Sequence, residues 1–202
     1  MTTTMPPSAQ PPIRRGPYAK TAQRRQEIVE AATNVFASRG YHGGSLRDIA
    51  RQIGLSLTSV VHHFPAKSDL LEAVLENADQ TGGWTLGLAR TEGVKVAILA
   101  QVDFNLERKE LLRLLAIVSS EASDPAHPAH QWFVDRYDNL ASGLAKLLEY
   151  DIERGRVSAD VDPELTGRLL AAMWDGLQLQ WLLDPTQDMH GQMDAALNRL
   201  LQ

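Results

Sequence analysis

Apolar residues recur along this chain at intervals of three and four, the period of a helix with one buried face. In the first such segment, which begins near Thr21, Ile28, Ala32 and Phe36 share a face, and Gly40 stands where a left-handed helix cap belongs. No segment alternates apolar and polar residues as a half-buried strand does. The pattern therefore predicts an all-α protein.

Two short helices are predicted after the first. Ser45 begins a capping box, Ser-Leu-Arg-Asp, and Gly54 can end the helix that it starts. Ser56 is placed to cap the next helix, over 57–63, before Phe64-Pro65 closes it. Two short helices joined by a tight turn with glycine form a helix-turn-helix.

The second of these helices has two distinct sides. Val60 and Phe64 lie four residues apart and are expected to face a three-helix core. The residues expected to point outward are Leu57, Thr58, Val61 and His62. A purely structural role leaves the exposed Leu57 and Val61 unexplained, whereas a helix that enters the major groove can use hydroxyl, imidazole and methyl groups.

The chain beyond Lys67 predicts a larger helical domain, with helices near 67–82, 91–107, 109–122, 128–154, 163–183 and 189–201. The segment 163–183 is apolar on two sides, so it needs two neighbours, of which the second is most simply another copy of the chain. Because 189–201 has one apolar face, the two segments together predict half of a four-helix dimer bundle.

Composition adds limits on the class of protein. A chain of 202 residues, of which 44% are hydrophobic, is long enough to bury a core. It has no cysteine, which excludes disulfides and thiolate metal sites and fits a reducing compartment. It also has no apolar run typical of a signal peptide or a membrane span. We therefore expect a cytoplasmic protein with no membrane partner.

The charge is unevenly distributed along the chain. Residues 1–67 carry nine Lys and Arg against three Asp and Glu, and the remainder carries eleven against twenty-two. The proline-rich start predicts a disordered basic arm over 1–19, followed by the helix-turn-helix domain over 20–66 and a helical ligand-binding and dimerisation domain over 67–202. The basic end of the chain is the candidate contact for a polyanion.

Residues 24–71 resemble the DNA-binding domain of the tetracycline-repressor (TetR) family. The order and spacing of Ile28, Phe36, Gly40-Tyr41, Gly54 and His63-Phe64 follow the family pattern over nearly fifty residues. The C-terminal run from about Glu107 looks like a subgroup common among actinobacterial members. The resemblance implies a homodimeric repressor that binds a palindromic operator in double-stranded DNA and leaves it when a small-molecule effector binds.

The resemblance also implies which residues contact DNA. It places His63 and Lys67 against phosphate, and Arg14, Arg15 and Lys20 resemble arms that enter the minor groove. One departure is Val61, where the family usually has a tyrosine that bonds a DNA phosphate. The predicted DNA-binding residues are Arg14, Arg15, Lys20, Ser45, Arg47, Leu57, Thr58, Ser59, Val61, His62, His63 and Lys67.

The effector site is predicted among the C-terminal helices, where a ligand could tilt the helix that starts at Lys67. Its predicted lining residues are Phe104, Phe133, Tyr137, Trp174 and Gln178, although each aromatic one could instead belong to the core or to the dimer interface. No cofactor is expected, and the sequence does not identify the effector.

Catalytic and metal-binding functions are the alternatives. The chain has no glycine-rich phosphate loop, nucleophile elbow or metalloprotease helix, so we do not expect an enzyme. Glu121, Asp124, His127 and His130 invite a metal site, but the prolines between them favour a loop that connects two helices. The contrasting function is a small-molecule-binding protein or enzyme of the same fold that has lost specific DNA binding.

Overall fold

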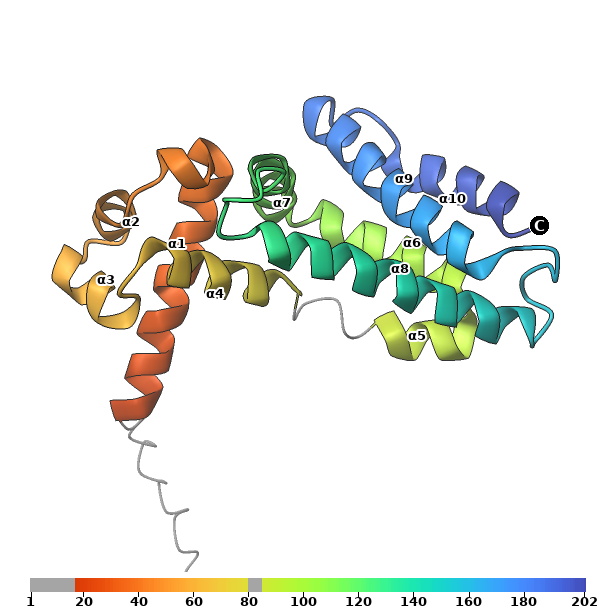
Figure 1. The fold of residues 1–202 in the computed structure, drawn as a ribbon, viewed down its shortest axis with the longest axis horizontal. Helices are drawn as coiled ribbons and strands as arrows, with labels where there is room; N and C mark the ends of the chain where they lie inside the picture. Colours follow the sequence, from red (N-terminus) through yellow and green to blue (C-terminus); the bar gives the residue numbers. More distant parts are fainter. Residues whose placement is uncertain (1–16, 80–84) are drawn as a thin grey trace, which may run out of the picture.

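The computed structural model describes residues 17–79 and 85–202, and within these ranges it contains α-helices and no strand. Figure 1 shows a smaller group of helices at the N-terminal end and a larger group that ends at the C-terminus. The helices are α1 (Pro17–Gly43), α2 (Leu46–Gln52), α3 (Leu57–His63), α4 (Lys67–Asp79), α5 (Thr85–Glu92), α6 (Val94–Leu106), α7 (Lys109–Glu121), α8 (His130–Ile152), α9 (Pro163–Leu183) and α10 (Met189–Leu200).

The predicted helix-turn-helix is confirmed, and its helices start at the predicted caps. The Ser45 hydroxyl accepts a hydrogen bond from the backbone N–H of Asp48 at 3.2 Å. The Ser56 hydroxyl accepts one from the backbone N–H of Ser59 at 3.1 Å. Each cap satisfies an N–H group that the first turn of a helix leaves without a partner. Val60 and Phe64 are buried, as predicted.

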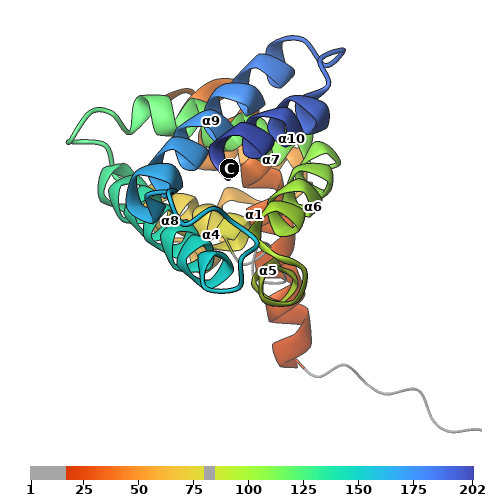
Figure 2. The same cartoon turned by 90° about the vertical axis from the view of Figure 1, so that its right-hand side faces the viewer.

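Two hydrophobic cores lie along the molecule. The first joins α1–α4 to α7 and includes Phe36, Leu71 and Leu114, so the helix-turn-helix shares its core with part of the C-terminal domain. The second lies among α6, α8, α9 and α10 and includes Leu148 and Met193. The end-on view of Figure 2 shows how α6, α8, α9 and α10, whose residues form this second core, are arranged around one another. None of the described helices is long and apolar enough to cross a membrane.

The structure corrects two of the predicted boundaries. Helix α1 already begins at Pro17, so the end of the arm predicted over 1–19 is helical. The helix predicted over 91–107 begins at Val94 as α6, and Gly93 separates it from α5, which the sequence pattern did not predict. The sequence of α5, with Gly87 and two threonines in eight residues, has too weak a helical pattern to be recognised without its neighbours.

Gly40 has the positive φ that its predicted role as a cap requires. Its φ of 70° and ψ of 175° are not those of the left-handed helix, and they kink α1 instead of ending it. Immediately after the kink, the backbone N–H of Tyr41 donates to the carboxylate of Glu121 at 2.7 Å. The last residue of α7 thus holds the end of α1.

Helices α8 and α9 cross closely at Gly167. A Cβ atom at this position would lie 2.6 Å from the carbonyl oxygen of Ala141 and 3.2 Å from the backbone nitrogen of Ala145. Backbone atoms of a buried helix cannot yield as a flexible side chain can. The crossing therefore requires glycine, and it sets the distance between two helices that line the cavity described below.

We predict that Gly167→Ala lowers the free energy of unfolding by about 1–3 kcal/mol, because the added methyl group forces α8 and α9 apart. Gly143→Ala on α8 is the matched control, since a Cβ atom there meets nothing within 4 Å. The control is expected to leave stability unchanged or raise it by up to about 1 kcal/mol. Urea unfolding of both variants measures the difference, and equal stability of the two would contradict the close crossing.

Candidate DNA-binding surface and ligand cavity

The face of α3 opposite the core is open to solvent. Thr58, Val61 and His62 are exposed, with Val61 at 39%, while Leu57 and Ser59 are partly buried. Val60 and Phe64 hold the other side of the helix in the first core. The helix therefore presents hydroxyl, imidazole and methyl groups outward on a rigid support, as contact with base edges in a groove requires.

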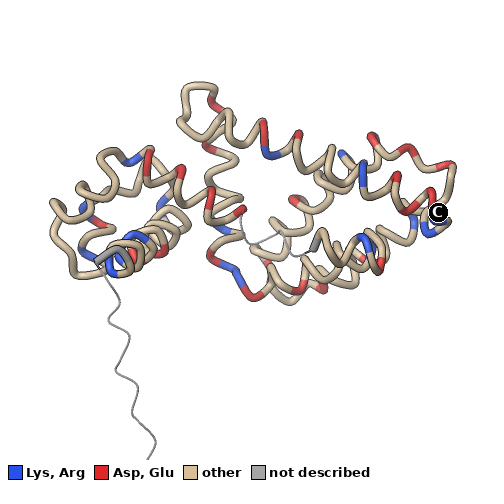
Figure 3. Tube along the Cα trace, turned by 90° about the horizontal axis from the view of Figure 1, so that it is seen from below, with Lys and Arg blue, Asp and Glu red and all other residues tan. Residues whose placement is uncertain are grey.

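Positive groups from α1 and α3 gather beside this face. Burial lowers the pKa of His63, and the neighbouring charges of His62, Arg24 and Arg25 lower it further. Arg25 lies over the Phe64 ring, with its guanidinium carbon 4.8 Å from the ring centroid. Figure 3 shows the Lys and Arg residues on this domain and the many Asp and Glu residues over the rest of the chain. Because these cations repel one another, an anion such as phosphate would stabilise the cluster.

The remaining residues that we predicted to contact DNA lie outside α3. Lys20 and Arg47 are exposed on α1 and α2. The Ser45 hydroxyl is engaged in the cap of α2 and also donates to the Asp48 carboxylate. Arg14 and Arg15 lie outside the described residues.

Lys67 joins the start of α4 to the end of α1. Its ammonium group donates to the carbonyl oxygens of Tyr41 at 2.8 Å and Gly44 at 3.0 Å, and it lies 4.3 Å from the centroid of the Tyr41 ring. Two of the three N–H donors of an ammonium group are therefore used within the protein. Sequence reasoning missed this role, because the partners are backbone atoms more than twenty residues away. A phosphate contact by Lys67 stays a prediction.

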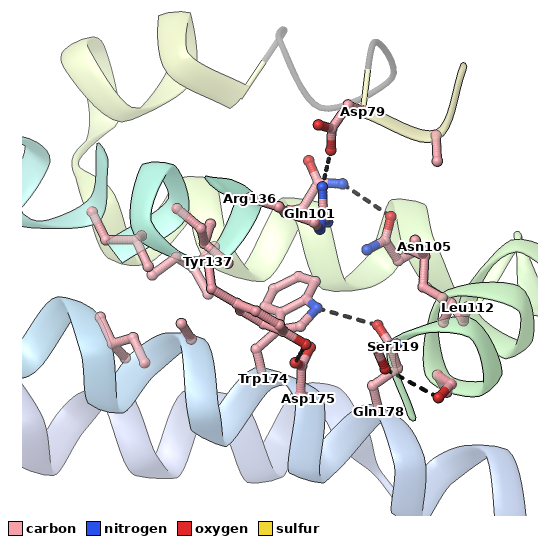
Figure 4. Close-up of a pocket in the computed structure, with 18 of the residues that line it drawn as sticks. Asp79, Gln101, Asn105, Leu112, Ser119, Arg136, Tyr137, Trp174, Asp175 and Gln178 are labelled. Atoms are coloured by element: carbon pink, nitrogen blue, oxygen red, sulfur yellow. Dashed lines mark hydrogen bonds and ion pairs between the residues drawn. The ribbon is translucent and has the colours of Figure 1, made fainter. Parts of the chain in front are cut away.

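A cavity of about 400 Å³ lies among α4, α6, α7, α8 and α9 (Figure 4). Four of the five predicted lining residues line it, namely Phe133, Tyr137, Trp174 and Gln178. Phe104 is not among the lining residues, and the guanidinium carbon of Arg108 lies 5.1 Å from its ring centroid. The prediction for Phe104 assumed that an aromatic residue on α6 faces inward, which helical spacing alone does not settle.

Most of the cavity wall is apolar, with leucines from α7, α8 and α9. Some of its polar groups are paired with one another: the Trp174 indole N–H donates to the Gln178 side-chain oxygen at 3.2 Å, and the Gln101 side-chain N–H donates to the Asn105 side-chain oxygen at 2.9 Å. The side-chain oxygen of Gln101 is buried without a hydrogen-bond partner. Sequence reasoning missed Gln101 and Asn105. The sequence contains a feature that could have identified them, since both are polar residues four apart within a strongly apolar helix.

An ion pair and a hydrogen bond to a carboxylate complete the wall. Arg136 on α8 forms an ion pair with Asp79 at the end of α4. The Tyr137 hydroxyl donates to the carboxylate of Asp175 on α9. Burial and this hydrogen bond raise the pKa of Tyr137 to about 12, so the phenol keeps its proton and remains a donor. A mainly apolar cavity with a few converging polar groups is typical of a small-molecule site.

The residues that invited a metal site are engaged in other contacts. Glu121 accepts the Tyr41 N–H, His127 accepts the backbone N–H of Ala129 at 3.1 Å, and His130 bonds the carbonyl of Ala122 at 2.8 Å. Among the described residues, no group of three His, Cys, Asp or Glu residues has the arrangement of a metal site. The segment between α7 and α8 is a connecting loop, as its prolines predicted.

An exposed apolar surface, which we call the α8–α9 surface, runs along these two helices. It consists of Val134, Tyr137, Leu165, Leu169, Leu179 and Leu183, the last of which is 79% exposed. The two-sided character predicted for 163–183 is confirmed, because the opposite side of α9, with Leu170, lies in the second core. The apolar face of α10 is buried in the same core through Met193 and Leu197. The prediction that 163–183 and 189–201 together form half of a dimer bundle stays a prediction.

Two family comparisons cover most of the chain. Residues 28–74 match bacterial regulatory proteins of the tetR family, and residues 91–202 match the C-terminal domain of BetI-type transcriptional repressors. The transcriptional regulator PksA of Bacillus subtilis is 25% identical over 178 residues, which cover 82% of each chain. The A-factor receptor protein of Streptomyces griseus is 26% identical over 180 residues, which cover 87% of this chain and 61% of the receptor.

Solved structures have the same fold. A transcriptional regulator from Saccharomonospora viridis, crystallised with choline, superimposes with a TM-score of 0.72 at 25% identity and covers 88% of this chain and 95% of its own. The matched C-terminal domain alone exceeds half of the chain, and the matched N-terminal domain contains α2 and α3. The protein therefore belongs to the TetR family of bacterial regulatory proteins and is a helix-turn-helix transcriptional regulator with a BetI-type C-terminal domain.

Proposed function

We propose that this regulator is a homodimeric repressor that binds a palindromic operator through α3 and is released when a small molecule occupies the cavity. One observation carries the proposal: the cavity reaches Ala78 and Asp79 at the end of α4, and α4 begins next to the helix-turn-helix. A molecule in the cavity can therefore act directly on the helix that leads to the DNA-binding domain.

The exposed face of α3 supports base contact by Thr58 and Ser59 and apolar contact by Leu57 and Val61, because methyl groups can meet the methyl group of thymine. Val61 cannot give the phosphate contact that the usual tyrosine gives. We therefore assign the contacts that hold the DNA backbone to His63 and to the neighbouring cations of α1.

The pH dependence of operator binding tests this assignment. A phosphate beside His63 opposes the lowering of its pKa, so binding takes up protons and affinity increases as the pH falls from 8 toward the pKa of the free protein. One proton taken up per subunit gives up to about a tenfold change per pH unit for each subunit. Fluorescence anisotropy with the intergenic DNA upstream of the gene measures the effect.

In that experiment His63→Gln is expected to flatten the pH dependence, and His42→Gln, which changes a histidine away from α3, is expected to keep it. The same slope for wild type and His63→Gln would remove His63 from the phosphate contacts. Equal affinity of the wild type for operator and for random DNA would contradict operator recognition itself.

The α8–α9 surface supports the dimer. Leu165, Leu169, Leu179 and Leu183 follow one side of α9 at helical spacing, and Val134 and Tyr137 continue the surface on α8. A second copy offers an identical surface, so a two-fold axis brings four helices together and covers all of these residues. A two-fold protein presents two identical α3 helices, for which a palindromic operator is the matching site.

We predict a wild-type mass of twice 22.3 kDa in sedimentation at micromolar concentration. Leu169→Asp buries an unpaired charge in the interface and is expected to raise the dimer dissociation constant by at least about 100-fold. Leu86→Asp on α5 is the matched control, because Leu86 is also exposed but lies outside the α8–α9 surface. A Leu169→Asp variant that remains dimeric would place the interface elsewhere.

Release requires an effector that binds one state of the C-terminal domain better than the other. Two structural links support such coupling: the ion pair of Asp79 with Arg136 joins α4 to α8, and the contact of Glu121 with Tyr41 joins α7 to α1. Two of the related proteins are associated with chemically different molecules: one is crystallised with choline, and the other is named a receptor for A-factor. The identity of the effector must therefore be inferred from this chain's own cavity.

A further inference from the structure

One carboxylate of the cavity, that of Asp175, forms no ion pair of its own with a described basic side chain. Asp79, Arg108, Arg136 and Asp175 are the charged residues of the wall. Arg136 forms its ion pair with Asp79, and the Arg108 guanidinium lies over the ring of Phe104, which does not line the cavity. Within residues 17–79 and 85–202, no basic side chain forms an ion pair with Asp175.

The surroundings of Asp175 disfavour the charged form of its carboxyl group. Burial raises the pKa of Asp175, and the Tyr137 hydrogen bond and the charge of Arg136 oppose that effect only in part. A carboxylate in an apolar environment loses hydration that one hydrogen bond does not replace. A perturbed carboxyl group that lines a cavity is a candidate functional site.

Aromatic rings stand next to the carboxylate. In Figure 4, Tyr137 and Trp174 lie beside Asp175 on one side of the cavity. Phe133 extends this side, with its ring centroid 6.3 Å from that of Tyr137. Aromatic faces attract cations, and the attraction is larger where water is excluded. A carboxylate bordered by aromatic rings is a suitable environment for an ammonium group.

We propose that the cavity selects amphiphilic cations, with the cationic group at Asp175 between Tyr137 and Trp174 and an apolar body along the leucine wall. This inference rests on the proposed function and names the chemical class of its effector. An anion at the same place is repelled by Asp175, and a neutral molecule gains neither the ion pair nor the cation–π contact.

The apolar wall favours a molecule with a longer apolar part than choline has. Leu112, Leu140 and Leu144 are among the residues that border the remainder of the 400 Å³ space. Each CH₂ group that is transferred from water to such a wall tightens binding by about fourfold. A short cation such as choline therefore leaves most of the available binding free energy unused, and an alkyl tail is expected to increase affinity.

Isothermal titration calorimetry of the full-length protein with four probes tests this proposal. Octyltrimethylammonium, 1-octanol and octanoate share an eight-carbon tail and differ in charge, and choline supplies the cation without the tail. We expect octyltrimethylammonium to bind at least tenfold more tightly than octanol or choline, and octanoate to bind most weakly.

Variants assign the selectivity to one side chain. Asp175→Asn is expected to abolish the preference of the protein for octyltrimethylammonium over octanol, and Asp175→Glu is expected to retain it. Asp160→Asn, which removes an exposed carboxylate in the loop before α9, is the matched control and is expected to bind as wild type does. If thermal unfolding without probe shows that Asp175→Asn does not fold, the affinity ranking of the four probes for the wild-type protein still tests whether the cavity selects amphiphilic cations.

Three outcomes would each overturn the proposal. Octanol could bind as tightly as octyltrimethylammonium, the Asp175→Asn variant could keep the preference for octyltrimethylammonium over octanol, or no probe could bind. Operator anisotropy without probe separates this failure from failure of the proposed function, because specific DNA binding by the free protein does not depend on the effector class. A cation that binds at Asp175 without weakening operator binding would support the ligand class and contradict release.

Discussion

The contact between the ends of α1 and α7 is the interaction on which the rest of the structure depends. At the kink of α1, the Glu121 carboxylate accepts the N–H of Tyr41, and the Lys67 ammonium group binds the carbonyl oxygens of Tyr41 and Gly44. Backbone groups at the end of a helix need such partners, because they have none within the helix. One glutamate and one lysine thus fix the helix-turn-helix to the C-terminal domain.

The same helices form the wall of the cavity. Helix α7 lines it from Leu111 to Ser119 and then ends at Glu121, while α4 starts at Lys67 and reaches the cavity with Asp79. In the proposed mechanism, a displacement of either wall would be transmitted to the contacts of Glu121 and Lys67 with the end of α1. Packed interfaces of this kind switch between discrete arrangements, which is why a small ligand can move a distant domain.

Local features of the sequence predicted much of this structure. The caps at Ser45 and Ser56 and the inward side of α3 depend on residues within one or two turns, so they could be inferred from spacing alone. The burial of α10 and the absence of Phe104 from the cavity wall depend on which neighbours each helix meets. Helical periodicity shows that a face is apolar but not whether its own chain or a second copy covers it.

The polar contacts were the least predictable. The sequence predicts that Lys67 is a cation at the start of a helix near DNA. Only the fold brings the backbone carbonyls of Tyr41 and Gly44 to its ammonium group. Asp175 stands out as a polar residue in an apolar helix, but its pairing with Tyr137 and the commitment of Arg136 to Asp79 require the packing of three helices.

In the proposed mechanism, occupation of the cavity and operator binding oppose each other, and a variant with a filled cavity tests this without a known effector. Ala116 lines the cavity from α7, so Ala116→Phe places an aromatic ring inside it. We predict that this variant binds the operator at least about tenfold more weakly by anisotropy, while its dimer mass and its unfolding temperature stay near those of wild type. A folded, dimeric Ala116→Phe variant that binds the operator as tightly as wild type would contradict the coupling.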